Sequence, residues 1–285
     1  MTLPTIFCLA SGRSGTHFLY EILRRNTRGV ICRHEPYGMN PSMFGRPIYD
    51  FAVGDQEALE RLARKKQRAI ERHRGAAAYV ETSHAFLKSW ADLAVGFFPA
   101  MKLVHLVRNP LAVAKSEALR EQLAHRWRLP FRNYRGGNGQ AYFRWSLTGL
   151  EPIFSYLVDH PLSRLQWYVV QWIEIENRAM SFLERHGKQR ECFTLHSPAE
   201  LNDADQVRSL LDFLALPRRG ADIVLAGRKN CTPGVSTAIL EEDRRELADV
   251  VRLLPDKYLA IFRQGPYCNW PWAKEFFGGE CDIIR

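Results

Sequence analysis

Short apolar runs alternate with segments of helical periodicity along most of the 285 residues. Runs with the length and composition of β-strands occur at 5–10, 29–33, 77–81, 102–107 and 191–195. Helices are expected at 16–25, 55–74, 86–95, 110–123, 164–185, 204–216 and 237–253. Strands that alternate with helices form parallel βαβ units. The sequence therefore predicts an α/β fold with a P-loop-like, open parallel sheet flanked by helices.

One stretch, residues 124–162, interrupts this alternation and is rich in Arg, Trp, Tyr, Phe and Gly. A chain of this length suits one large α/β domain. We therefore expect a single domain over residues 1–285, with 124–162 as an irregular insertion on the substrate side. The arginines and aromatic rings within it suit sugars, bases, carboxylates or sulfates. The alternative is that these rings complete the hydrophobic core.

The formal net charge of +9 indicates an anionic partner, either nucleic acid or a multiply phosphorylated small ligand. We expect no nucleic-acid partner, because none of the common nucleic-acid-binding motifs is present and the basic residues gather beside the phosphate motifs described below. No stretch approaches the roughly 20 apolar residues of a membrane span. No secretion signal precedes the first strand. These features predict a cytoplasmic protein without a membrane span.

The six cysteines are scattered, and none forms a C-x-x-C pair. The sequence therefore predicts neither a zinc site nor a redox motif. No cluster of carboxylates or histidines has a convincing ligand spacing, so we expect no catalytic metal. Cys268 and Cys281 could pair near the C-terminus, although cytosolic thiols usually stay reduced. The sequence leaves this pairing and the oligomeric state open.

The loop at residues 11–16 (SGRSGT) lies between the first expected strand and the first expected helix. N–H groups of such a turn converge on one point, where the helix dipole favours an anion. Its glycines allow a close backbone approach, and its arginine and hydroxyl side chains add donors. The candidate ligands are Gly12, Arg13, Ser14, Gly15 and Thr16, followed by His17. The alternative is an ordinary turn that caps a helix.

This loop lacks the lysine of a Walker A motif, which holds the β- and γ-phosphates of a nucleoside triphosphate. Its only cation is Arg13, early in the loop. The loop therefore fits a terminal phosphosulfate better than a triphosphate. A P-loop kinase-like phosphotransferase is the alternative enzyme, and a basic nucleotide- or RNA-binding module is the non-enzymatic alternative.

A second candidate anion site follows the fourth expected strand. Arg108 leaves the C-terminal end of that strand, where open α/β sheets bind their ligands. Ser116 lies eight residues further on, about two helical turns away. The turn at Asn109-Pro110 lets both side chains reach one phosphate. Taken alone, Arg108 would read as a surface cation beside a turn.

Together, the two motifs resemble those of the sulfotransferase family that uses 3′-phosphoadenosine 5′-phosphosulfate (PAPS). The segment SGRSGTHFL is similar to the family's 5′-phosphosulfate loop. The segment HLVRNPLAVAKS is similar to its 3′-phosphate motif, with the Arg-to-Ser spacing intact. Residues 227–230 (GRKN) resemble its late basic loop, although Asn230 replaces the final glycine. The match runs in order over about residues 5–255, and only the first two motifs are specific.

The resemblance implies an enzyme that moves a sulfuryl group from PAPS to a hydroxyl, or to an amine, of an acceptor such as a carbohydrate or another small molecule. It implies that residues 13–16 hold the phosphosulfate. It also implies that Arg108, Ser116, Arg228 and Lys229 hold the 3′-phosphate. Cytosolic members usually carry Lys at the position of Arg13, so Arg here resembles the carbohydrate and tyrosylprotein branches.

Sulfuryl transfer to a hydroxyl needs a group that accepts its proton. Glu35 directly follows the second strand, and a similarly placed Glu is the base in the carbohydrate and tyrosylprotein branches. His84 directly follows the third strand and resembles the catalytic His of the cytosolic branch. We favour Glu35, although nearby cations lower a carboxylate's pKa and weaken it as a base. Arg13 completes the expected catalytic set, because its charge can neutralise the leaving phosphate.

Overall fold

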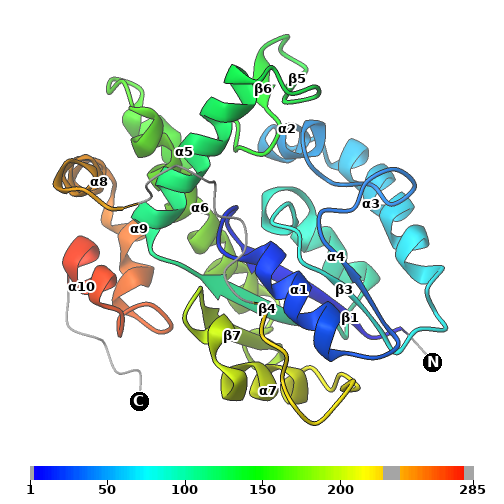
Figure 1. Cartoon of the computed structure of the whole chain (residues 1–285). Coiled ribbons are helices and arrows are strands. Elements are labelled where there is room, and N and C mark those ends of the chain that lie inside the picture. The colour runs from blue at the N-terminus through cyan, green and yellow to red at the C-terminus, as the bar shows by residue number, and fades with distance from the viewer. Residues whose placement is uncertain (1–2, 227–237, 279–285) are drawn as a thin grey trace.

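The strand β1 (Thr5–Ala10) lies at the centre of a five-stranded parallel sheet (Figure 1). The computed structural model describes residues 3–226 and 238–278 of the chain. In spatial order the strands are β2 (Val30–Arg33), β3 (Ala78–Glu81), β1, β4 (Lys102–Val107) and β7 (Cys192–His196). Each neighbouring pair is parallel, so the predicted open parallel sheet is confirmed. All of β1 is buried, which explains its nearly continuous apolar sequence.

The strand order creates a crevice at the C-terminal ends of β1 and β4. From β1 the chain moves outward to the edge strand β2 and returns to β3, whereas from β4 it moves the other way to β7. Ligands of open α/β sheets bind where connections leave adjacent strands toward opposite sides. Ala10 pairs with Leu106, so the two strand ends lie at the same level. Both phosphate motifs of the sequence therefore start at this crevice.

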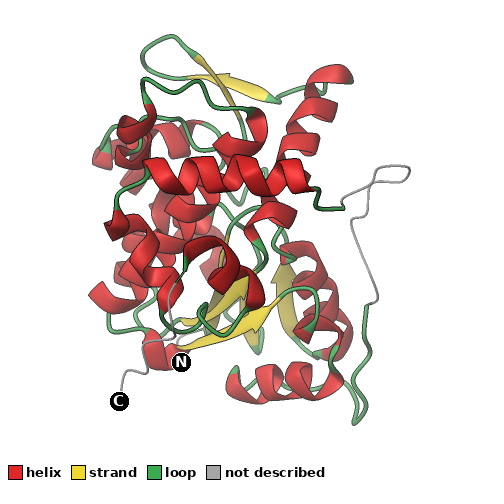
Figure 2. Ribbon diagram, turned by 90° about the vertical axis from the view of Figure 1, so that its left-hand side faces the viewer, coloured by secondary structure: helices red, strands yellow, loops and turns green. Residues whose placement is uncertain are grey.

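Helices cover both faces of the sheet (Figures 1 and 2). They are α1 (Thr16–Asn26), α2 (Arg46–Ala52), α3 (Gln56–Glu71), α4 (Ala91–Phe97), α5 (Pro110–Arg126), α6 (Arg164–Arg185), α7 (Ala204–Phe213), α8 (Glu241–Leu253), α9 (Asp256–Leu259) and α10 (Pro271–Phe277). One core joins α1 and α7 to Cys8 of β1. The other core joins α6 and a short π-helix, η1 (Phe86–Trp90), to Phe7 and Leu9. Successive side chains of β1 thus divide between the two cores.

The segment 124–162 is not irregular throughout, which corrects the expectation from the sequence. Helix α5 continues to Arg126, and β5 (Asn133–Arg135) pairs antiparallel with β6 (Ala141–Phe143). Figure 2 shows this hairpin at one end of the molecule, apart from the main sheet. Strands of three residues are too short to show an alternating pattern, so the hairpin left no periodic signal in the sequence.

The helix α2 was also not predicted, because it belongs to a segment rich in Pro, Gly and Asn, a composition typical of loops. Pro47 occupies the first turn, where its missing N–H costs nothing. Ile48 is fully buried in the core, which gives the short helix its stability. The helix therefore depends on tertiary packing, which the local sequence does not display.

Two expectations about the whole chain concern membranes and cysteines. Within residues 3–226 and 238–278, no helix combines the length and the apolar character needed to cross a bilayer. The thiols of Cys8, Cys32 and Cys192 are free. Cys268 is disulfide-bonded. Cys281, with which the sequence left its pairing open, lies outside the described residues.

Candidate active site

The predicted phosphate loop connects β1 directly to α1, as its sequence implied. Gly15 stands immediately before α1 with φ 102°, a backbone conformation that favours glycine. Ser11 and Ser14 are fully buried, and their hydroxyl oxygens lie 2.6 Å apart in a hydrogen bond. This bond closes the loop on itself. The first N–H groups of α1 are thereby fixed at the crevice, where they can receive an anion.

Gly12 is wedged against two side chains from other parts of the chain. A Cβ atom at this position would lie 1.8 Å from Oε1 of Glu117 and 3.2 Å from Cε1 of His84. Real Cβ atoms do not approach a buried carboxylate that closely, so only glycine fits without a rearrangement. The back of the loop is therefore packed against groups from α5 and from the end of β3.

The structure brings the two sequence motifs into direct contact. Nε of Arg13 donates a hydrogen bond of 2.8 Å to Oγ of Ser116. Nη1 of Arg108 donates one of 2.6 Å to the main-chain oxygen of Arg13. Ser116 reaches this point because Asn109 caps α5 by accepting from the N–H of Leu111 at 2.9 Å, which sets the helix start. Arg13, Arg108 and Ser116 thus form one cationic cluster at the crevice.

The two candidate bases also lie together. Oε1 of Glu35 is 3.3 Å from Nε2 of His84 and 3.8 Å from Nε2 of His34. Glu35 has φ 45°, a conformation uncommon for a non-glycine residue, and its side chain is 25% exposed. The His84 side chain is only 1% exposed. The sequence treated Glu35 and His84 as alternatives, whereas the fold makes them an adjacent pair.

Burial and neighbouring charges act in opposite directions on Glu35. Burial by itself would raise its pKa, but the contact with His84 and the charges of His34 and Arg120 lower the pKa to about 2. Burial, followed by the charge of Lys88, lowers the pKa of His84 to about 4. At neutral pH the pair therefore consists of a carboxylate and a neutral imidazole. Both groups are then unprotonated, and the lowered pKa makes the Glu35 carboxylate a weaker base than an ordinary glutamate.

Three charged residues behind the loop were missed in the sequence. Lys88 is fully buried and donates a hydrogen bond of 2.6 Å to the main-chain oxygen of Trp145. Its burial lowers its pKa to about 7, against the opposing charge of Glu117. Glu117 is fully buried and forms an ion pair with Arg120. The guanidinium of Arg120 lies over the ring of Trp145, 5.5 Å from its centroid.

A signal for these residues exists in the sequence, but it is ambiguous. Glu117 and Arg120 are three residues apart on a helix, a spacing that is typical of exposed ion pairs. Lys88 stands four residues after His84 in a segment with few other polar side chains. Only the tertiary fold shows that these charges are inside the molecule.

The remaining predicted residues fall into three groups. Thr16 is buried at the start of α1, and His17 follows it in the first helical turn. Arg228 and Lys229 lie outside the described residues, so the third motif has no structural account. Within 124–162, Trp127 is 62% and Phe131 is 80% exposed, whereas Tyr142 and Phe143 are buried. The aromatic residues of this segment therefore divide between surface and core.

Comparisons with known proteins give a likeness in structure only. No protein-family profile matches the sequence, and no curated protein matches it. The crystal structure of a sulfotransferase from Alicyclobacillus acidocaldarius is 16% identical, covers 89% of this chain and 94% of its own, and has a TM-score of 0.45. The sulfotransferase domain from the curacin biosynthetic pathway is 14% identical, covers 76% of this chain and 75% of its own, and has a TM-score of 0.42. Likenesses this distant do not indicate the function of this chain.

Proposed function

We propose that this chain is a PAPS-dependent sulfotransferase. The observation that carries the proposal is the contact between the two motifs, in which Arg13 donates to Ser116 and Arg108 donates to the backbone of Arg13. Two sites suited to phosphate groups therefore lie side by side at the ends of β1 and β4. A nucleotide with phosphates on both its 5′ and 3′ positions needs such a pair of sites.

The donor would be held by groups of two kinds. The loop N–H groups and the hydroxyl of Thr16 would bind its 5′-phosphosulfate, together with the guanidinium of Arg13. Arg108 and Ser116 would bind its 3′-phosphate, and Arg228 and Lys229 remain proposed partners of that phosphate. The arginine at position 13 would neutralise the negative charge that develops on the leaving 5′-phosphate oxygen. No metal ion is needed for this charge balance.

The acceptor hydroxyl would lose its proton as its oxygen forms the new bond to sulfur. The bond between sulfur and the 5′-phosphate oxygen breaks, and adenosine 3′,5′-bisphosphate leaves. We assign the proton to the carboxylate of Glu35, which lies 3.3 Å from the ring of His84. His84 would hold that carboxylate in place. Arg at position 13 and Glu after β2 both favour the carbohydrate and tyrosylprotein branches over the cytosolic one.

A thermal-shift comparison of four ligands tests this proposal against its rivals. We expect adenosine 3′,5′-bisphosphate to raise the Tm more than AMP, ATP or a short RNA at equal concentration, because the protein carries a site for the 3′-phosphate. Saturation at about 100 times the Kd stabilises a protein by about 2.7 kcal/mol. A larger shift with ATP and Mg²⁺ would support the kinase-like alternative, and a larger shift with RNA would support the binding module.

Transfer itself is measured with ³⁵S-labelled PAPS and a panel of hydroxyl and amine acceptors. We expect transfer to continue in EDTA. Activity that stops in EDTA and returns with Mg²⁺ would contradict the proposed charge balance.

A further inference from the structure

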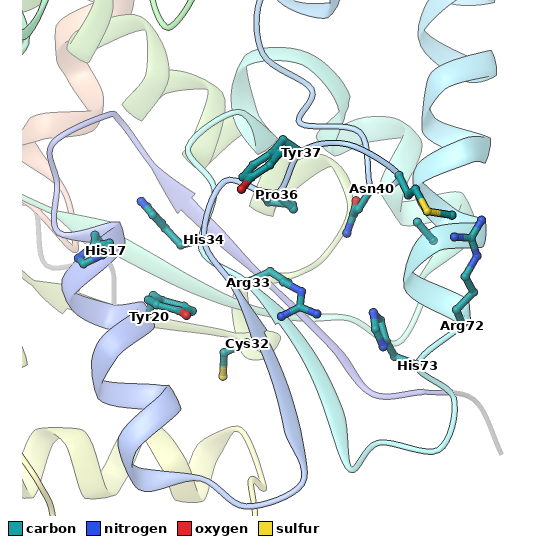
Figure 3. A pocket seen from close by; sticks show the side chains of 12 residues that line it. His17, Tyr20, Cys32, Arg33, His34, Pro36, Tyr37, Asn40, Arg72 and His73 are labelled. Atoms are coloured by element: carbon teal, nitrogen blue, oxygen red, sulfur yellow. The ribbon is translucent and has the colours of Figure 1, made fainter.

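A groove of ≈ 660 Å³ opens beside the C-terminal end of the edge strand β2. Figure 3 shows its side chains in two groups. His17, Tyr20 and His34 lie on the side of α1, and Arg33, Arg72 and His73 lie on the side of α3. Pockets of about 300–1,000 Å³ are typical of small-molecule sites. The groove is therefore large enough for a small molecule or for the end of a longer chain.

The lining of this groove is basic, without a carboxylate among its 12 residues. Arg33 and Arg72 are exposed. Within the part of the chain that the structure describes, neither guanidinium has an ion-pair partner. The nearby carboxylate of Glu71 is engaged elsewhere, with Arg74 at 2.9 Å. Two unpaired guanidinium groups at one groove are suited to hold an oxyanion by charge-assisted hydrogen bonds.

His73 shows that both guanidinium groups act on the same place. Burial, then the charge of Arg33 and then that of Arg72, lowers the pKa of its imidazole. The positive potential of the two arginines therefore overlaps at this end of the groove.

The wall of the groove is fixed by partly buried hydrogen bonds. Nδ2 of Asn40 donates to the hydroxyl of Tyr79 at 2.9 Å, and its Oδ1 accepts from Nζ of Lys66 at 3.1 Å. Lys66 is fully buried and pairs with Glu81 at 2.9 Å. The loop that follows β2 is thereby tied to α3 and β3. A wall held in this way is preorganised and needs little ordering when a ligand binds.

The groove also adjoins the proposed base. The rings of His17 and His34 lie 5.0 Å apart at its inner end, and Nε2 of His34 is 3.8 Å from the carboxylate of Glu35. Apart from His17, which follows the phosphate loop and lines the groove, the donor motifs lie at the ends of β1 and β4, on the other side of β3. The ends of β2 and β3 are therefore the half of the sheet edge that is left for an acceptor.

We infer that this groove binds the acceptor, and that the acceptor is a hydroxylated molecule which carries a separate carboxylate, bound between Arg33 and Arg72. The reacting hydroxyl would lie toward His34 and Glu35. This inference rests on the proposed sulfotransferase function.

Matched acceptor pairs test the inference. One pair is methyl β-glucuronide and its methyl ester, and the other is 4-hydroxyphenylacetate and its methyl ester. Both members of a pair carry the same hydroxyl groups, and the ester replaces the charged carboxylate by a neutral group. Binding is followed by saturation-transfer NMR in the presence of adenosine 3′,5′-bisphosphate, and transfer by kcat/KM with labelled PAPS. We expect the anionic member to be favoured about tenfold or more in at least one pair. The sugar pair and the aromatic pair distinguish an anionic sugar from an anionic phenol as the acceptor.

The double variant Arg33→Gln/Arg72→Gln should lose this preference. Both side chains are exposed, so the variant should keep the Tm of the parent protein. Arg68→Gln is the matched control for a single charge, because Arg68 is exposed on α3 and does not line the groove. It should leave the preference unchanged.

The possible outcomes separate the two proposals. The inference about the groove is overturned if both members of each pair bind equally or if neither binds. It is also overturned if the double variant keeps the preference for the anionic member. If adenosine 3′,5′-bisphosphate then still stabilises the protein, the proposed function stands without it. If the double variant loses the anion preference, the groove is supported as an anion site. If adenosine 3′,5′-bisphosphate also fails to stabilise the protein, the proposed sulfotransferase function is overturned.

Discussion

The guanidinium of Arg13 donates from Nε to the hydroxyl of Ser116, 2.8 Å away, although the two residues are separated by 103 positions in the chain. The bond joins a loop that follows β1 to a helix that follows β4. Each motif alone fits an ordinary turn or a surface cation. The hydrogen bond places both motifs beside the same crevice of the sheet, so the two motifs together form one candidate site.

Arg108→Ala should weaken adenosine 3′,5′-bisphosphate much more than AMP. Loss of a charge-assisted hydrogen bond to the 3′-phosphate costs about 1.5–3 kcal/mol, about ten- to a hundredfold in affinity. Isothermal titration calorimetry with both nucleotides measures the difference. Arg126→Ala, in the exposed last turn of α5, the helix that follows Arg108, is the control and should change neither affinity. An equal loss for both nucleotides would mean that Arg108 only supports the loop through the backbone of Arg13.

Glu35→Gln should lower turnover about 10²–10⁴-fold while donor affinity and fold are retained, since an amide cannot accept the proton. His84→Asn should be the milder change, because we assign His84 to the positioning of the carboxylate. Turnover on a true acceptor and separate nucleotide binding provide the two readouts. A dead His84→Asn variant beside an active Glu35→Gln variant would reverse the assignment and move the enzyme toward the cytosolic branch.

Lys88 should make the protein more stable as the pH rises from 7 to 8.5. Its pKa is about 7 in the fold and 10.5 as a reference value, so in this window the unfolded chain binds a proton that the folded chain has released. The free energy of unfolding should rise by about 1.5 kcal/mol over this range from this group. Urea unfolding at several pH values measures the slope.

The Lys88→Met variant should lack this slope, whatever its overall stability. The comparison stays below pH 8.5 because burial raises the pKa of Cys8 above its reference value of 9.0 and that of Cys192 to about 12. At higher pH the unfolded chain would release these thiol protons, and the sign of the change would reverse. An identical slope in the variant would show that Lys88 does not titrate near pH 7.

Removing either charge of the buried ion pair between Lys66 and Glu81 should lower the stability of the protein. Lys66→Met leaves a buried carboxylate, and Glu81→Gln leaves a buried ammonium group, so each should lower the free energy of unfolding by about 3–5 kcal/mol. The double variant should lose clearly less than the sum of the two single losses. Urea unfolding of all four proteins provides the cycle. Additive losses would mean that the two charges do not stabilise each other.

Much of the fold was readable because the apolar runs are short and well bounded. The expected limits of β1 and β4 coincide with the observed strands, Thr5–Ala10 and Lys102–Val107. The position of Arg108 at a strand end followed from those limits. Parallel strands that are buried on both faces give this clear signal, because they require an apolar residue at nearly every position.

The rest of the site was hidden because its determinants are tertiary. Glu117 was indistinguishable from an exposed helical glutamate, and its full burial follows only from the packing of α5 against the loop after β1. The adjacency of Glu35 and His84 depends on the pairing of β2 with β3, which no local pattern specifies. The groove beside β2 likewise combines residues from α1, β2 and α3.

The close approach of Gly12 to Glu117 couples two positions that lie far apart in the sequence and have different chemical roles. A methyl group on residue 12 would lie 1.8 Å from the carboxylate oxygen, so Gly12→Ala should destabilise the protein when Glu117 is present. The same change should be better tolerated beside Glu117→Ala, which vacates the space. In related chains, the residues at positions 12 and 117 should therefore change together. A mutant library that randomises only one of the two positions would miss the pairs of substitutions that are functional only in combination.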